Sequence, residues 1–211
     1  MKNILLIIIT ILLFTLAVPG IIAQESQTEN GNWFMRHFDQ RIYSGFYSSF
    51  GDEKANILQA GYDAVFNLID ITPAWSLLDF SLGMDVLFVR DQIQKETKDN
   101  FGHIRHTDNR MIFGFEFNWC ARLYFLQIPK IRTSIFVEGL GMTLVVYTKP
   151  YPGGGTHVNI GTHLGLGMKF RINDVLNAYT TIRLFSHTSN GQAEATNPAL
   201  DMAGLIVGLQ F

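Results

Sequence analysis

The sequence predicts an all-β fold, an eight-stranded antiparallel outer-membrane β-barrel. Three observations lead to it: an apolar leader with the layout of an export signal, segments of alternating polarity, and 17 phenylalanines and 19 glycines among 211 residues. Aromatic and small residues suit strands that pack closely and pass a membrane interface. After the leader no uncharged run approaches the length of a spanning helix, so any membrane-spanning part would be a barrel.

The first residues are expected to form a cleaved signal peptide. Lys2 precedes an apolar stretch over residues 4–18, and Pro19–Gly20 and the small residue Ala23 follow. This is the order of a secretory signal. An uncleaved anchor helix is the alternative, but Pro19–Gly20 interrupts the apolar run and no basic cluster follows. The domain prediction is a signal peptide over 1–23, an N-terminal segment over 24–39 and a membrane β-barrel over 40–211, with the candidate site between strands seven and eight.

Charge and cysteine content exclude some classes of protein. The chain has 16 basic and 18 acidic residues, and this near balance suggests neither nucleic acid nor an anionic membrane surface as a partner. The single cysteine, Cys120, cannot form an intramolecular disulfide. Because Cys120 lies in an apolar-rich stretch, we expect it to be a packing residue.

The clearest strands lie near the C-terminus. From Val158 to Phe170 the even positions are apolar except for Thr162, and the odd positions are small or polar. From residue 203 to Phe211 the odd positions are apolar again. In a membrane barrel the apolar positions face lipid and the small or polar positions face the lumen. The terminal aromatic, Phe211, resembles the assembly signal of bacterial outer-membrane proteins.

The rest of the chain completes an even number of strands. The segments after strands two, four and six are short, whereas those after strands three, five and seven are longer; the short link after strand one departs from this trend. This asymmetry is typical of a barrel with short periplasmic turns and both chain ends on the periplasmic side. The expected strands are 40–50, 55–68, 75–89, 111–126, 132–147, 157–172, 177–189 and 200–211.

The seventh strand ends on "HTSN", residues 187–190. Residues i and i+2 of a strand lie on one side, so His187 could act as the base for the Ser189 hydroxyl. Asp201, at the start of the last strand, has lipid-facing parity, where a carboxylate is costly unless it is paired. The alternative is that these are ordinary turn residues and that Asp201 is a solvated rim charge. The residues alone leave both interpretations open.

The stretch "HTSNGQAEATNPALD" resembles the lipid A 3-O-deacylase family (PagL-type, also called acyloxyacyl hydrolase). The resemblance implies an eight-stranded outer-membrane barrel whose outward-facing triad removes an ester-linked acyl chain from lipid A. It implies Ser189 as nucleophile, His187 as general base, Asp201 as the acid, and Asn197 and Asn190 as oxyanion residues. The implied partners are lipid A, or lipopolysaccharide, and outer-membrane lipids. No metal or cofactor is implied, and a homo-oligomer stays open.

The sequence departs from the family pattern in two residues. Asp201 stands where the family has a glutamate and is one methylene shorter. Ala199 stands where a glycine is common. Asp201 would therefore need a closer backbone or a bridging water to reach the histidine.

Strand parity sets a further condition. Ile182 and Leu184 have the lipid-facing parity, whereas His187 and Ser189 have the opposite one. A bulge near residues 185–186 would re-aim the end of the strand toward lipid. Without such a bulge the site would point into the lumen.

Other functions remain as alternatives. One is a non-enzymatic small barrel, an adhesin or a structural protein. Another is a soluble lipid-binding β-barrel, which would require the apolar parity to face inward. A metal site at His103 and His106 is weakly supported, because their spacing matches no strong ligand pattern and the segment is a charged loop.

Overall fold

The computed structural model describes residues 38–50, 54–72, 75–99, 102–152, 155–189 and 199–211. The expected signal peptide and most of the expected N-terminal segment lie outside these residues. The strands are β1 (Phe38–Ser49), β2 (Lys54–Thr72), β3 (Trp75–Asp99), β4 (Gly102–Ile128), β5 (Thr133–Tyr147), β6 (Val158–Arg171), β7 (Asn177–Ser189) and β8 (Ala199–Gln210), with a 3-10 turn, η1 (Pro129–Ile131), between β4 and β5.

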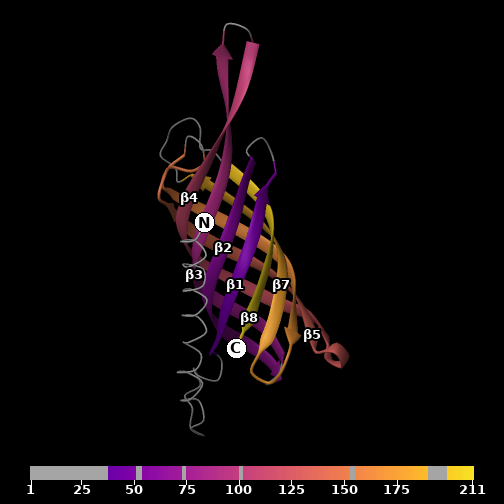
Figure 1. Cartoon of the computed structure of the whole chain (residues 1–211). Helices are drawn as coiled ribbons and strands as arrows, with labels where there is room; N and C mark the ends of the chain where they lie inside the picture. The colour runs from indigo at the N-terminus through magenta and orange to yellow at the C-terminus, as the bar shows by residue number, and fades with distance from the viewer. Residues whose placement is uncertain (1–37, 51–53, 73–74, 100–101, 153–154, 190–198) are drawn as a thin grey trace, which may run out of the picture. The chain divides into compact units, whose positions relative to one another are not determined.

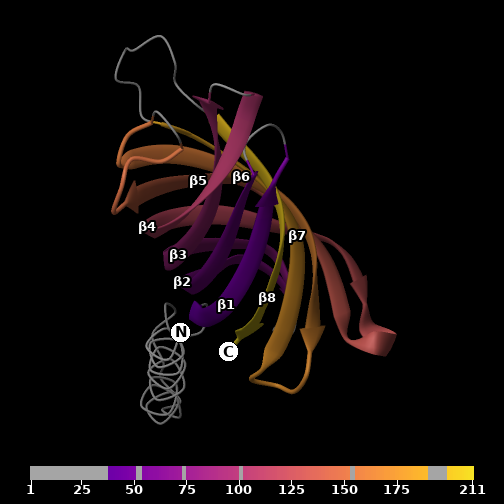
Figure 2. The same cartoon turned by 45° about the horizontal axis from the view of Figure 1, so that its top comes forward.

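The eight strands form a closed barrel in sequence order, and β8 pairs antiparallel with β1 (Figure 1). Figure 2, in which the top of Figure 1 comes forward, shows the strands following one another round a single wall. The predicted all-β fold of eight antiparallel strands is thus confirmed. Among the described residues, no helix is long and apolar enough to cross a membrane.

The main difference from the sequence prediction lies between β3 and β4. Residues 90–110 were expected to form a long charged loop, but the backbone continues as a hairpin, paired from Gln92 opposite Asn109 to Asp99 opposite Gly102. This hairpin projects beyond the rest of the barrel (Figure 1). The loop prediction rested on charge, whereas a two-stranded ladder satisfies backbone hydrogen-bonding groups whatever the side chains carry.

The apolar faces of the strands point outward. In β6, buried and exposed residues alternate, and Leu164 and Leu166 are 55% and 56% exposed. Ile182 of β7 and Val207 of β8 are exposed in the same way. A barrel with this outer surface has the character of a membrane-spanning one. The alternative of a soluble barrel with an apolar interior is therefore wrong.

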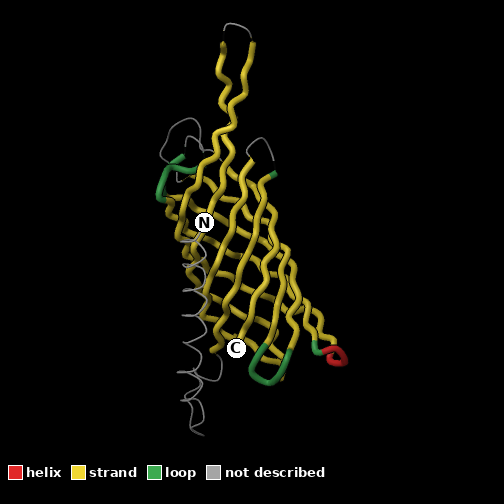
Figure 3. Tube along the Cα trace, in the orientation of Figure 1, coloured by secondary structure: helices red, strands yellow, loops and turns green. Residues whose placement is uncertain are grey.

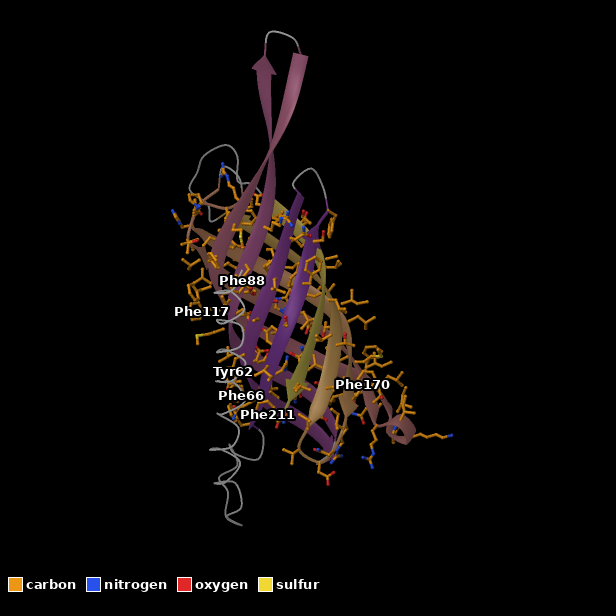
Figure 4. All side chains as sticks on the ribbon, in the orientation of Figure 1. Tyr62, Phe66, Phe88, Phe117, Phe170 and Phe211 are labelled. Carbon is orange, nitrogen blue, oxygen red and sulfur yellow. The ribbon has the colours of Figure 1, made fainter. Side chains whose placement is uncertain are left out.

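Aromatic side chains mark two levels of the barrel wall (Figure 4). Tyr62, Phe66, Phe170 and Phe211 lie toward the end that holds the C-terminus, and Phe88 and Phe117 lie nearer the opposite end. Outer-membrane barrels carry such aromatic girdles at both membrane interfaces.

The lumen is filled by polar and charged side chains. Glu138 of β5 forms ion pairs with Arg122 of β4, at 3.0 Å, and with Arg183 of β7. A second cluster surrounds Asp85, which accepts hydrogen bonds from Tyr43, Gln59 and Asn118 at 2.6–2.8 Å. Buried charges require such partners, because an unpaired one is costly in a low-dielectric interior.

The two ends of the barrel differ. The C-terminus, η1 and the short turn over residues 172–176 lie at one end, and the β3–β4 hairpin lies at the other (Figure 3). Short turns and chain ends belong to the periplasmic side of an outer-membrane barrel. The hairpin end is therefore called the outer end below.

Candidate active site

A hollow of about 320 Å³ lies on β6, β7 and β8 toward the outer end. Its outward-facing polar residues come from one row of the sheet, in which Thr162 pairs with Ser186 and Ser186 pairs with Asp201, and the buried His163 of β6 also lines it. Leu164 and Leu184 also line it and face each other in the register, two residues farther from the outer end. The hollow therefore has a polar upper edge and an apolar floor.

Asp201 is exposed at this polar edge, as its lipid-facing parity predicted. Its backbone carbonyl accepts a hydrogen bond of 3.1 Å from the backbone N–H of Phe50. Phe50 follows directly after β1 and also lines the hollow. This hydrogen bond links the beginning of β8 to the end of β1 and fixes the backbone position of Asp201 in the barrel wall.

The other four candidate residues are only partly described. His187 and Ser189 belong to the backbone of β7, where they pair with Gly161 and Asn159 of β6. Their side chains lie outside the described part of the structure, as do Asn190 and Asn197 altogether. Of the candidate triad, only Asp201 thus has a described side chain.

The register of β7 shows no bulge. Its pairing with β6 continues without a shift to Ser189, and its pairing with β8 continues to Thr188. The backbone positions of His187 and Ser189 are therefore in phase with Phe185, whose side chain is buried inside the barrel. The irregularity that sequence parity called for near residues 185–186 is absent from this backbone.

The same register fixes the partners across β8. His187 pairs with Leu200, a buried residue, and Asp201 pairs with Ser186. A shift of one residue at the end of β7 would bring His187 opposite Asp201 and reverse the facing of the last side chains.

The sequence model of one protein family, PagL, described as lipid A 3-O-deacylase, matches residues 95–210. The match covers more than half of the chain and includes β7, β8 and the segment between them. The chain belongs to the PagL family. This confirms the resemblance noted in the sequence. No curated protein matches the chain at a significant level.

A solved structure agrees on the fold. The outer membrane enzyme PagL has 12% sequence identity and a TM-score of 0.54, covering 80% of this chain and 97% of its own. Neisserial surface protein A has 12% identity and a TM-score of 0.48, with 82% and 94% covered. OprG from Pseudomonas aeruginosa has 9% identity and a TM-score of 0.49, with 82% and 94% covered. The family and the fold identify the chain as a protein of the bacterial outer membrane.

Two residues that line the hollow, Thr162 and Ser186, were not predicted from the sequence. Both are hydroxyl residues at lipid-facing positions of strands that are otherwise largely apolar there. That break in the apolar pattern was visible in the sequence. Its meaning was not, because only the register brings Thr162, Ser186 and Asp201 into one row.

The inside of the barrel anchors the strand that bears the candidate site. Arg183 of β7 pairs with Glu138 of β5 and donates a hydrogen bond of 3.3 Å to the Tyr47 hydroxyl of β1. These contacts link β7 to strands that it does not adjoin in the wall. They hold β7 just below the hollow.

No group of three or more histidine, cysteine, aspartate or glutamate residues could hold a metal ion in the part of the chain that the structure describes. The side chains of His103 and His106 lie outside that part. Cys120 is buried, in agreement with the expected packing role.

Proposed function

We propose that this chain is an outer-membrane esterase that removes an ester-linked acyl chain from lipid A. The observation that carries the proposal is the PagL-family match, which spans the whole segment from "HTSN" to Asp201. We assign Ser189 as nucleophile, His187 as general base and Asp201 as the acid that orients it. Asn197, aided by Asn190, is assigned to the oxyanion.

The hollow supports this assignment by its chemistry. An acyl chain of lipid A has a polar ester end and a hydrocarbon tail that extends into the membrane. The polar edge with Asp201 suits the ester end, and the apolar floor with Leu164 and Leu184 suits the tail. Catalytic pockets are commonly concave and largely apolar, with a few convergent polar groups.

The proposed reaction has two steps. The Ser189 Oγ attacks the ester carbonyl carbon while His187 accepts the hydroxyl proton, and the tetrahedral oxyanion is held by the Asn197 amide. The bond between the acyl carbon and the sugar oxygen then breaks, and His187 gives its proton to the departing sugar oxygen. In the second step His187 deprotonates water, which attacks the acyl carbon, and the proton then passes to the Ser189 Oγ as the fatty acid leaves. Asp201 stabilises the imidazolium in both steps.

The proposal requires the end of β7 to differ from the continuous register described above. In the active protein, a β-bulge between Phe185 and Ser189 must turn the His187 and Ser189 side chains outward, toward Asp201. Bulges are frequent beside active sites and at barrel rims, where they re-aim a side chain.

The uninterrupted register of β7 favours a second candidate function, a non-enzymatic small barrel of adhesive or structural type. In that case the chain would keep the family's fold without a triad on the membrane side. The two candidates make opposite predictions for lipid A.

The test uses cells whose lipid A has ester-linked acyl chains and that express the full chain. We expect mass spectra of lipid A to show the loss of one acyl chain with the wild type and no loss with Ser189→Ala. Ser44→Ala is the matched control, since Ser44 is an exposed serine of β1 that does not line the hollow. Intact lipid A with the wild type would favour the non-enzymatic barrel. Deacylation by Ser189→Ala would remove Ser189 from the mechanism.

A further inference from the structure

Two short turns meet at the periplasmic end of the barrel. One comprises η1 and Arg132, and the other joins β6 to β7 over residues 172–176. Both turns lie at the same end of the barrel (Figure 3), and the backbone N–H of Arg171, the last residue of β6, donates a hydrogen bond of 2.9 Å to the carbonyl of Arg132. We call Lys130, Ile131, Arg132 and residues 171–175 the basic turn cluster.

The basic turn cluster has a surplus of positive charge. Arg171 forms an ion pair of 2.9 Å with Asp174, so these two charges offset each other. Lys130 and Arg132 are exposed, and they supply the surplus. The near balance of charge over the whole chain therefore conceals a local cationic site.

Apolar side chains lie among these cations. Ile131, between the two basic residues, is 61% exposed, and Ile172 and Val175 are 52% and 68% exposed. Phe170, the residue before Arg171 in β6, belongs to the group of aromatic residues at the periplasmic end of the wall (Figure 4). Exposed apolar side chains flanked by lysine and arginine are typical of a surface at the level of lipid headgroups. The basic turn cluster is thus continuous with the lipid-facing surface.

The backbone at Arg132 adds a separate observation. Arg132 has a left-handed conformation, with φ of 51°, at the C-terminal end of η1, and its N–H donates to the Pro129 carbonyl at 3.1 Å. Glycine or asparagine is usual in such a position, because a Cβ atom is disfavoured there. The turn holds an arginine where glycine would be less strained, so the shape of the turn does not explain the choice of residue.

We propose that the basic turn cluster binds the phosphate of an anionic phospholipid in the inner leaflet of the outer membrane. Short turns place it on the periplasmic side, where the leaflet neighbouring the barrel presents phosphate headgroups. The Arg132 guanidinium can hold two phosphate oxygens at once, and the Lys130 ammonium adds a second charge. Ile131, Ile172 and Val175 then contact the upper part of the acyl chains. This site is remote from the hollow and does not depend on the esterase proposal.

The test measures the retention of phosphatidylglycerol by the full chain in detergent, by native mass spectrometry at increasing lipid concentration. We expect the wild type to bind phosphatidylglycerol more tightly than phosphatidylethanolamine. The double variant Lys130→Gln/Arg132→Gln should lose about fivefold in affinity for each cation removed. Lys149→Gln is the matched control, since Lys149 is an exposed lysine after β5 at the outer end, and it should bind as the wild type does.

A further variant separates binding from folding. Arg132→Gly removes the guanidinium and suits the left-handed backbone, so the barrel should fold at least as well while phosphatidylglycerol binding falls. The proposal is overturned if Arg132→Gly and the double variant retain phosphatidylglycerol as the wild type does. It is also overturned if the wild type binds phosphatidylethanolamine equally well, because the site would then not select a headgroup of net negative charge.

Discussion

Asp201 is the candidate triad residue whose surroundings are best defined. It is exposed on the membrane-facing side of β8, at the polar edge of the hollow, and its carbonyl is bound by the Phe50 N–H. Its lipid-facing parity was predictable, because period-two alternation from residue 203 to Phe211 extends back to it. Its neighbours in the row, Thr162 and Ser186, were not predictable, since parity does not give the register between strands.

Substitutions at Asp201 test its role as the acid. Asp201→Asn keeps the shape of the side chain but cannot stabilise an imidazolium, so kcat for lipid A deacylation should fall by roughly 10³- to 10⁴-fold. Asp201→Glu restores the residue that the family has at this position and should keep activity near the wild-type level. Purified protein with a defined lipid A provides the measurement, and Asp174→Asn, in a distant exposed turn, is the control. Full activity of Asp201→Asn would exclude Asp201 from the triad.

At the scale of the element, the decisive feature is the end of β7. The sequence predicted β7 over residues 177–189, and the structure has the same bounds. It also predicted that the outward-facing site needs a bulge, and the described backbone has none. A bulge places one extra residue in a strand relative to its partners. The alternation of apolar and polar residues does not show where that extra residue lies.

Single cysteines can measure which residues at the end of β7 face the membrane. In a Cys120→Ala background, the esterase proposal predicts that Ser189→Cys reacts with a maleimide probe dissolved in the lipid phase. The continuous register predicts reaction of Thr188→Cys instead, because Thr188 is in phase with the membrane-facing Ser186. Labelling of Thr188→Cys with protection of Ser189→Cys would contradict the proposed outward turn of the site.

The luminal anchor of β7 makes a separate prediction about stability. Glu138 forms ion pairs with both Arg122 and Arg183, and all three are buried. Glu138→Gln would leave two guanidinium groups without their carboxylate, so the free energy of unfolding should fall by about 3–5 kcal/mol. Urea unfolding of the barrel in lipid vesicles measures this change. Asp174→Asn, which removes an exposed ion pair, should leave the urea midpoint unchanged. Equal midpoints for Glu138→Gln and the wild type would show that the luminal pairs do not stabilise the barrel.

At the scale of the whole molecule, much of the architecture follows from patterning. The alternation of apolar and polar residues predicted that the apolar faces of the strands point outward, and the short turns predicted which end is periplasmic. The β3–β4 hairpin did not follow, because its charged and polar sequence is as common in loops as in paired strands outside a membrane. The filled lumen did not follow either, since the ion pairs of Glu138 join β4, β5 and β7 across the barrel.

The filled lumen predicts that the barrel does not conduct ions. Arg122 and Tyr124 are fully buried, and Tyr151, after β5, is buried against Tyr147 with ring centroids 5.1 Å apart. Small barrels whose interior is filled by side chains leave no aqueous channel. Planar bilayers containing the purified protein should show no channel steps above the bare bilayer. Steady single-channel currents would contradict this description of the lumen.

We propose that Ser189 forms an acyl-enzyme with the chain removed from lipid A. The experiment treats the purified protein with lipid A or with a fluorophosphonate and then maps the modified serine by peptide mass spectrometry. We expect modification of Ser189 in the wild type and none in Ser189→Ala or His187→Ala. Modification of Ser186 instead, or deacylation of lipid A without any modified serine, would contradict it.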